Sequence, residues 1–314
     1  MTVQPASLPQ FADDLSTPPL TLMQLGWLRL RRHKMALFGG MMLILLILFS
    51  FGSSFFVTEK YANFNDTSQR LRPPSSEHPF GTDSIGRDIL ARTIYGGQIS
   101  LVIGFVAVLI ETILGILVGA LAGYYGGAVD AILMRFTEAL LSIPTILLLL
   151  TMAKFFGGSV PEISIAGRTL SGSVVVIIVI IGATSWMYLA RIVRAEFLSL
   201  KEREFILAAR ATGTSNLDII FLHILPNTFA PIIVSSTLSV ANAILAEAYI
   251  SFLGLGVQPP TATWGNMLDN SVKYLDSAPW LWFFPGMLIL LTVLSINFLG
   301  DGMRDALDPR SRTV

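Results

Sequence analysis

This 314-residue chain contains no cysteine, and only 13% of its residues are charged. The first absence excludes disulfide bonds and thiolate metal sites, although it does not identify the compartment. Lysine and arginine balance aspartate and glutamate at 21 each, so the formal net charge is zero. A neutral chain offers no electrostatic attraction to a nucleic acid, and we therefore expect no such partner.

Motifs for catalysis are also missing. The sequence has no Gly-x-x-x-x-Gly-Lys-Ser/Thr phosphate loop and no Gly-x-Ser-x-Gly nucleophile turn. The three histidines, His33, His78 and His223, are too far apart in the sequence to suggest a metal site by spacing. We therefore expect a non-catalytic chain that binds no metal and no cofactor itself.

What the chain has in excess is apolar sequence. Hydrophobic residues make up 53%, and the mean hydropathy is +0.67. About 20 apolar residues cross the hydrocarbon of a bilayer as a helix. The sequence contains six such runs, so it predicts an all-α, polytopic membrane protein with six transmembrane helices. The predicted spans are 35–58, 100–124, 131–153, 169–190, 226–253 and 277–300.

The distribution of basic residues predicts the orientation. Residues 1–26 lack an apolar core, so they are not expected to form a cleaved signal peptide. With the N-terminus inside, 13 of the 21 lysines and arginines are cytoplasmic, including the cluster 29–34 before the first span. Six spans then place both termini in the cytoplasm. The predicted parts are a cytoplasmic segment 1–34, a transmembrane domain 35–301 with an outer loop 59–99 and a cytoplasmic loop 196–226, and a cytoplasmic tail 302–314.

The most informative segment lies in that cytoplasmic loop. The spacing of Phe205, Ala208, Ala209 and Thr212 predicts one face of a short helix, and Gly213 permits a sharp turn after it. Ser215 and Asp218 form a capping-box variant for a second helix, which would place Leu217, Ile220, Phe221 and Ile224 on one face. Pro226 predicts a break before the fifth span. The pattern alone leaves two alternatives open, which are docking into another protein and resting on lipid headgroups.

The same segment resembles the EAA loop of the permease subunits of bacterial ABC importers. That motif has Glu-Ala-Ala, three residues, Gly, nine residues and Ile-x-Leu-Pro. Matching positions here are Ala208, Ala209, Gly213, Leu225 and Pro226. Leu207 stands in place of the glutamate and His223 in place of the isoleucine.

Three further segments strengthen the resemblance. Residues 78–88, HPFGTDSIGRD, are similar to a signature of the second permease subunit of dipeptide, oligopeptide and nickel importers. Residues 252–265 look like the outer segment before the last span of that family, and residues 300–310 look like its C-terminal ending. The resemblance extends over residues 20 to 312.

The resemblance implies a type I ABC importer permease fold in a bacterial inner membrane. Its implied partners are a homologous second permease subunit, two cytoplasmic ATPases that bind ATP and magnesium, and an extracytoplasmic solute-binding protein. Peptides are the expected cargo, with nickel or another small solute as the alternative. The residues implied to couple to the ATPase are Glu204, Phe205, Ala208, Ala209, Arg210, Gly213, Leu225 and Pro226.

The outer motif invites a structural interpretation as well as a functional one. Asp83 and Ser84 are good N-cap residues for the helix that follows, and Arg87 can pair with Asp83. We therefore favour loop ordering over direct ligand contact for the motif. Trp264 and Trp280 are expected at the membrane interface, or else in contact with the binding protein. The motif residues are Gly81, Thr82, Asp83, Gly86, Arg87 and Asp88.

Polar residues within the spans are candidates for the translocation pathway. Glu111, Asn242 and Glu247 lie in otherwise apolar runs, where a carboxylate is costly unless it faces protein or water. The alternative is that they hydrogen-bond neighbouring helices. A secondary transporter is a rival class, but such proteins show internal repeats with broken helices, and no convincing repeat is present in this sequence.

Overall fold

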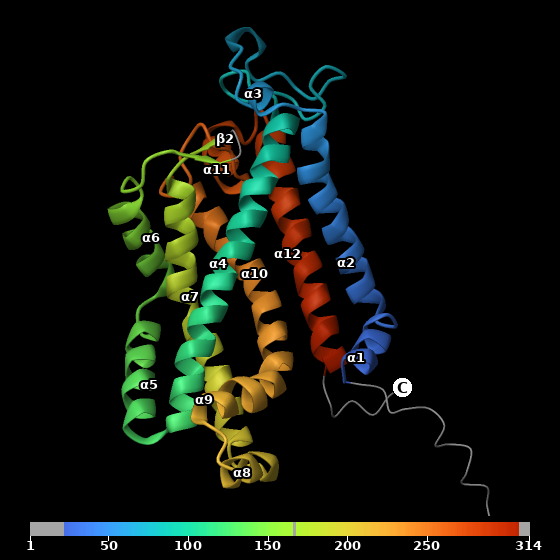
Figure 1. Cartoon of the computed structure of the whole chain (residues 1–314). Helices are drawn as coiled ribbons and strands as arrows, with labels where there is room; N and C mark the ends of the chain where they lie inside the picture. Colours follow the sequence, from blue (N-terminus) through green and yellow to red (C-terminus); the bar gives the residue numbers. More distant parts are fainter. Residues whose placement is uncertain (1–21, 166–167, 308–314) are drawn as a thin grey trace, which may run out of the picture.

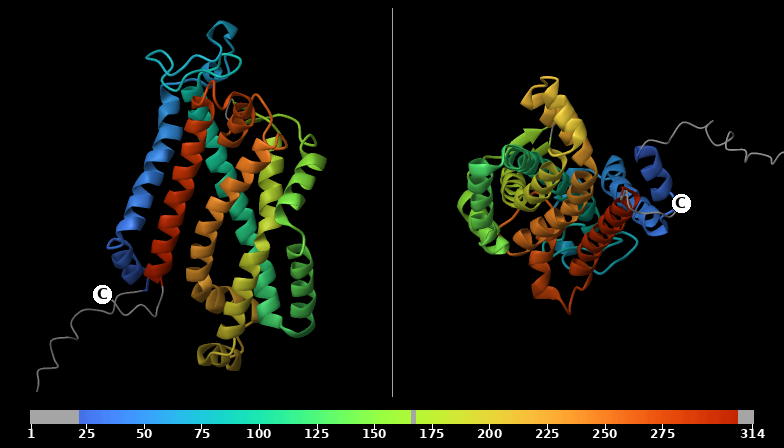
Figure 2. Two further views of the ribbon diagram at one scale, coloured as in Figure 1. Left: turned by 180° about the vertical axis from the view of Figure 1, so that it is seen from behind. Right: turned by 90° about the horizontal axis from the view of Figure 1, so that it is seen from below.

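The computed structural model describes residues 22–165 and 168–307. Long helices stand side by side in a bundle (Figure 1). The bundle has two distinct ends. The "terminal face" has helices α1 and α8 and the end of α12, and the "loop face" has α3, β2 and α11 (Figures 1 and 2).

Within the described residues, five helical stretches are long and apolar enough to cross a membrane, or up to six if one bent pair is counted. The all-α expectation is confirmed, because helices of all lengths together make up most of the described residues. The five stretches are 34–55 (beginning with α2, Lys34–Ile47), α4 (Ile89–Tyr125), α7 (Ser173–Leu200), 216–252 (ending with α10, Phe229–Phe252) and α12 (Trp280–Leu307).

The bent pair occupies the predicted third span. Helices α5 (Gly127–Leu141) and α6 (Thr145–Phe156) meet at 84° instead of forming one helix over 131–153. Pro144 explains the break, because a proline disfavours helical backbone in the residue before it, here Ile143. The carbonyl of Pro144 then accepts hydrogen bonds from Leu147 and Leu148 as the new helix begins.

Three helices extend beyond the predicted spans. Helix α4 begins at Ile89, so the end of the predicted outer loop 59–99 is already helical. Helix α7 continues to Leu200 past Arg191 and Arg194, and α12 continues to Leu307 into the predicted tail. Charged residues mark where a span leaves the hydrocarbon, but they do not end a helix, so span lengths underestimate helix lengths.

Shorter helices and strands lie at the two ends of the bundle. Helix α1 (Leu22–Leu30) packs on α12 at the terminal face. Helices α3 (Glu59–Ala62) and α11 (Trp264–Asp269) lie at the loop face. Strands β1 (Ile163–Ile165) and β2 (Arg168–Leu170) pair antiparallel, with Ile163 opposite Leu170. This hairpin is a small departure from the all-α prediction.

Among the described residues, helices α4 and α7 pack against each other more extensively than any other pair of helices. Glycines at every fourth residue of α4 let the two backbones approach, because a Cβ on Gly119 would lie 2.5 Å from the carbonyl oxygen of Ala190. Gly115 and Gly123 meet Leu189 and Phe197 in the same way. Small residues at such spacing are a common means of packing helices within a bilayer, where no hydrophobic effect drives association.

We expect Gly119→Ala to destabilise the protein by about 1–3 kcal/mol, because the added methyl group forces α4 and α7 apart. Thermal unfolding of the purified protein in detergent measures the change. Gly286→Ala in α12 is the matched control, since its Cβ would have no atom within 4 Å. Equal stability of the two variants would contradict the close α4–α7 packing.

Candidate functional site

The segment between α7 and α10 protrudes from the terminal face. Helix α8 (Glu204–Ala211) projects beyond the ends of the long helices, and the short helix α9 (Asn216–Asp218) lies level with those ends (Figures 1 and 2). A π-helical turn over Ile219–Ile224 and a 3₁₀ turn over Leu225–Thr228 then join α9 to α10. The predicted break or kink at Pro226 is therefore present as a change from π-helical to 3₁₀ turns within the stretch 216–252.

The turn between α8 and α9 follows the sequence prediction closely. Gly213 has a φ of +82°, in the left-handed region that favours glycine. The N–H of Thr214 bonds the carbonyl of Ala209, and the N–H of Gly213 bonds that of Arg210, which is a Schellman helix end. Ser215 caps α9 by accepting from the N–H of Asp218 at 3.2 Å. The helix-turn-helix prediction is confirmed.

The buried side of this segment differs from the prediction. Ile206, Ile219, Ile220 and Ile224 are buried against Val193 and Phe197 of α7, together with Ala120 and Tyr124 of α4. Phe205, Ala208 and Thr212 are exposed and Ala209 is half-buried, so the first predicted face is the outward one. The second predicted face is divided, because Ile220 and Ile224 are buried while Leu217 and Phe221 are exposed. The π-helical turn shifts the helical spacing after Asp218, which explains this difference. Ile206, which lies outside the predicted face, is the anchor that the sequence prediction missed.

Tyr124, near the end of α4, holds the segment in place. Its hydroxyl donates a hydrogen bond to Oδ1 of Asn216 at 2.6 Å. The guanidinium carbon of Arg210 lies 5.4 Å from the centre of the Tyr124 ring, within the range of a cation–π contact. One aromatic side chain therefore contacts both helices of the turn.

The outward side of the segment is apolar and exposed. Phe205, Leu207, Leu217, Phe221 and Leu222 each leave at least two fifths of their surface uncovered. Contiguous exposed apolar surface is typical of a binding surface. Of the predicted coupling residues, Glu204, Phe205, Ala208, Arg210, Gly213 and Pro226 are exposed, and Ala209 and Leu225 are half-buried.

We expect Tyr124→Phe to loosen α9 without unfolding the protein. The lost hydrogen bond contributes about 1 kcal/mol, so amide exchange in residues 216–218 should rise about fivefold. Hydrogen exchange followed by mass spectrometry measures it. Tyr125→Phe is the matched control, because in the described part of the chain the Tyr125 hydroxyl makes no hydrogen bond. An unchanged rate in Tyr124→Phe would show that Ile206 and its neighbours alone fix the segment.

At the loop face, the outer motif forms a compact turn. Asp83 accepts hydrogen bonds from the N–H groups of Ile85 and Arg87, both at 2.9 Å, and its carboxylate pairs with the Arg87 side chain at 2.6 Å. The predicted Asp83–Arg87 pair is therefore present. Gly81 and Gly86 both have positive φ. Trp280 of α12 donates to the carbonyl of Thr82 at 3.1 Å, so the motif is fixed to the bundle.

Asp88, rather than Asp83 or Ser84, caps the helix after the motif. Its Oδ1 accepts from the N–H of Ala91 at 2.7 Å, and its Oδ2 lies 2.7 Å from Nδ1 of the buried His78. The predicted cap was therefore wrong, because Asp83 folds back on its own turn. Nearby, hydrogen bonds from Ser68 lower the pKa of the Asp66 carboxyl below its usual value.

The intramembrane carboxylates lie between helices. Glu247 has no exposed surface, and it accepts hydrogen bonds from Ser100 of α4 at 3.0 Å and from Ser251 at 2.7 Å. Glu111 of α4 accepts from Ser239 of α10 at 2.7 Å. Asn242, by contrast, is exposed on α10. In this chain the two carboxylates therefore have the interhelical partners that the alternative interpretation requires.

Trp264 belongs to the same buried network. Its backbone N–H donates to Ser100 Oγ, and its indole N–H donates to the carbonyl of Thr93 at 2.9 Å. The side chain is fully buried. The expectation that Trp264 lies at the membrane interface was wrong, because its ring fills the space between α4 and α10 at the loop face.

We expect Glu247→Leu to lower stability by about 1–3 kcal/mol, because the hydroxyls of Ser100 and Ser251 lose their acceptor. Glu247→Gln keeps an acceptor oxygen and the size, so it should remain near wild-type stability. Thermal unfolding of the purified protein distinguishes them. If Glu247 belongs to a translocation pathway, the Glu247→Gln variant should be stable but show altered uptake. Unchanged uptake in this variant would mean that Glu247 has a structural role alone.

Comparison with known proteins places the chain in a family. Residues 115–313 match the family described as binding-protein-dependent transport system inner membrane component. Residues 21–74 match the N-terminal transmembrane domain of oligopeptide transport permease C. The chain belongs to the binding-protein-dependent transport system inner membrane components, and it is a multi-pass inner membrane protein.

Curated relatives cover most of the chain. It is 42% identical over 285 residues to the dipeptide transport system permease protein DppC of Alkalihalophilus pseudofirmus, covering 91% of this chain and 89% of that protein. It is 39% identical to DppC of Bacillus subtilis, covering 96% and 90%. The oligopeptide transport system permease protein OppC of Bacillus subtilis is 36% identical, with coverage of 96% and 94%.

Solved structures show the fold. A chain of the MetNI methionine ABC transporter, described in inward-facing conformations, aligns with a TM-score of 0.51 at 21% identity, covering 68% of this chain and 94% of that one. The expected type I ABC importer permease fold is therefore confirmed. Among the described residues, no group of three or more metal-binding side chains is found.

Proposed function

We propose that this chain is the second permease subunit of an ATP-driven importer for short peptides. The observation that supports the proposal most is the exposed apolar segment at 203–228, held by Tyr124 and Ile206 and matching the EAA pattern. The peptide cargo is proposed because the relatives with 36–42% identity bear the names of dipeptide and oligopeptide permeases. Nickel or another small solute remains the alternative.

The proposed orientation places the terminal face in the cytoplasm. Helix α8 lies at the same end of the bundle as α1 and the end of α12 (Figure 1). Arg31, Arg32 and Lys34 are exposed at this end, which agrees with the excess of basic residues on the cytoplasmic side. The exposed segment would then meet a cytoplasmic ATPase, and the loop face would meet a solute-binding protein.

The proposed ATPase contact uses the predicted coupling residues. Phe205 and Leu207 offer apolar surface, and Ala208 and Ala209 let another protein approach the helix closely. A push on α8 reaches α4 through Arg210 and Tyr124, and it reaches α7 through Ile206. We propose that nucleotide-driven closure of two ATPases, which hold ATP and magnesium, biases the permease pair between two facing states through these contacts.

The proposed pathway lies beside α10, where a homologous second permease would complete it. Asn242 supports this assignment, because an exposed amide in a membrane-spanning helix needs a polar partner or water. Glu111 and Glu247 would then support that helix from behind through Ser239, Ser100 and Ser251.

Uptake by the reconstituted complex tests the function. Proteoliposomes that contain both permeases and both ATPases should accumulate labelled dipeptide only under two conditions. ATP must be present inside the vesicle, where the ATPases lie, and the binding protein must be present outside. Ionophores that dissipate ion gradients should leave uptake unchanged. Uptake that follows the ion gradient would indicate a secondary transporter, and uptake of nickel without peptide would move the cargo to the alternative.

Variants at Gly213 test the coupling assignment. We expect Gly213→Val to reduce uptake at least about tenfold, because the left-handed backbone costs an ordinary residue about 1–2 kcal/mol and more for a branched one. Gly213→Asn should retain most uptake, because asparagine tolerates this conformation. Uptake and copurification of the ATPases are the measurements.

Two further variants control that experiment. Ala209→Glu should also uncouple uptake, since it places a charge where close docking is proposed. Gly158→Val, at a position away from this segment where a Cβ meets no atom within 4 Å, should have no effect. Normal uptake and normal ATPase copurification in both Gly213→Val and Ala209→Glu would overturn the coupling assignment.

A further inference from the structure

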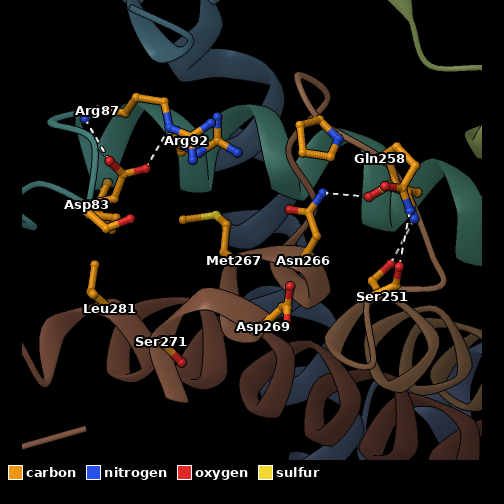
Figure 3. A pocket seen from close by; sticks show the side chains of 15 residues that line it. Asp83, Arg87, Arg92, Ser251, Gln258, Asn266, Met267, Asp269, Ser271 and Leu281 are labelled. Atoms are coloured by element: carbon orange, nitrogen blue, oxygen red, sulfur yellow. Dashed lines mark hydrogen bonds and ion pairs between the residues drawn. The ribbon is translucent and has the colours of Figure 1, made fainter. Parts of the chain in front are cut away.

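A polar cavity opens at the loop face between the outer motif and the segment before α12. It encloses about 200 Å³ and lies between the start of α4, the 254–259 loop and α11 (Figure 3). Its wall includes Asp83, Arg87 and Arg92 from the motif side and Gln258, Asn266 and Asp269 from the opposite side. Asp83, Ser84, Arg87 and Gln258 come from segments that the family resemblance singled out but to which it assigned no ligand.

The motif side of the cavity has one positive charge in excess. Asp83 is occupied by Arg87, which it binds at 2.6 Å while also accepting from two backbone N–H groups. Asp88, the other carboxylate of the motif, contacts His78 and the N–H of Ala91 and does not line the cavity, so Arg92 is the second arginine beside a single lining carboxylate. It is 4% exposed, and its Nη1 donates to Asn63 Oδ1 at 3.1 Å. A guanidinium has five N–H donors, so this contact uses only part of its capacity.

The opposite side carries a negative charge. Asp269 is the last residue of α11, and it is exposed at the edge of the cavity. No ion pair to Asp269 is present in the described part of the chain, although Lys273 follows one helical turn later. Figure 3 shows Arg92 on the α4 side and Asp269 on the α11 side, with Met267 and Asn266 between them.

We propose that this cavity binds a small zwitterion, with its carboxylate toward Arg92 and its ammonium group toward Asp269. Opposite charges on two walls fit a ligand that carries both charges, and they disfavour a ligand that carries only one. The volume suits a short free peptide rather than a longer chain. This inference rests on the proposed function, and it makes the cavity a first receiving site on the permease for peptide released at the outer face.

The amide side chains of the cavity would orient the ligand. Asn266 is fixed by donating to the carbonyls of Val257 and Thr261 at 3.0 and 2.9 Å. Gln258 donates to the carbonyls of Gly256 and Gly254 at 3.0 and 3.3 Å. Oδ1 of Asn266 also accepts from the N–H of Thr263 at 3.0 Å, which leaves it one further lone pair. Oε1 of Gln258 makes no hydrogen bond within the described residues, so it is the freer acceptor for the N–H group of a peptide bond. The two charged walls are thus separated by the side chains of Asn266 and Gln258, whose positions are fixed by their own hydrogen bonds.

Ligand variation in the unaltered complex tests the proposal without risk of misfolding. Saturation-transfer NMR on the complete permease–ATPase complex in nanodiscs, without binding protein, should detect the zwitterion Ala-Leu at millimolar concentration. N-acetyl-Ala-Leu-amide has no charge at either end and should bind about tenfold or more weakly. Equal signals from both compounds would overturn the proposal.

Matched acidic variants locate the site. Asp269→Asn should weaken Ala-Leu binding about fivefold and leave binding of the N-acetyl amide unchanged. Asp276→Asn, an exposed acidic residue outside the cavity, is the control and should have no effect. Unchanged Ala-Leu binding in Asp269→Asn would overturn the proposal.

Two further measurements separate this site from the proposed function. Arg92→Lys keeps the positive charge, and thermal unfolding checks that the variant folds. We expect the folded variant to bind Ala-Leu about fivefold more weakly. Ala-Leu binding equal to that of the wild type would overturn the proposal. ATP-dependent peptide uptake by the wild-type complex tests the function independently. Normal uptake with no zwitterion preference at the cavity overturns only the receiving site, whereas absent uptake overturns the peptide function itself.

Discussion

The close contact between α4 and α7 determines where everything else in this protein can lie. Glycines on α4 allow α7 to pack directly against the backbone of α4 over several turns. Helix α4 has 37 residues, so it spans about 55 Å without a break. Asp88 caps it at the loop face, and Tyr124 binds the protruding segment near its other end. One stiff element therefore links the outer motif to the turn at the terminal face.

This arrangement separates two uses of polar side chains within the membrane. Serines on α4 and α10 give Glu111 and Glu247 hydrogen-bond donors, which removes much of the cost of burying a carboxyl group between helices. Asn242 has no such role in this chain, since it is exposed on α10. Polar residues that look equivalent in a hydropathy profile thus differ in what they contact.

The sequence was most informative where local backbone chemistry decides the outcome. Gly213, the Ser215 cap and the Asp83–Arg87 pair are all present as predicted, because each depends on residues within a few positions of one another. One local prediction failed, because Asp88 takes the cap position that was assigned to Asp83 or Ser84. Predictions that depend on distant packing were less accurate still. Ile206 is an anchor only because α4 and α7 lie beneath it, and Trp264 is buried only because α4 passes beside it. No periodicity within a single segment contains that information.

The π-helical turn at Ile219–Ile224 has a consequence for how this segment tolerates insertions and deletions. A π turn holds about one residue more than an α-helical turn, so the extra residue is absorbed without rotating α8 and α9 around the axis of α10. Removing one residue there would restore a regular helix and leave α8 and α9 in about the same orientation. Continuing a regular α-helix through all six residues would instead rotate everything before them by about 100°. Asn216 would then leave Tyr124, and Ile206 would leave its cluster, so the position of the segment depends on the π-helical geometry of this joint.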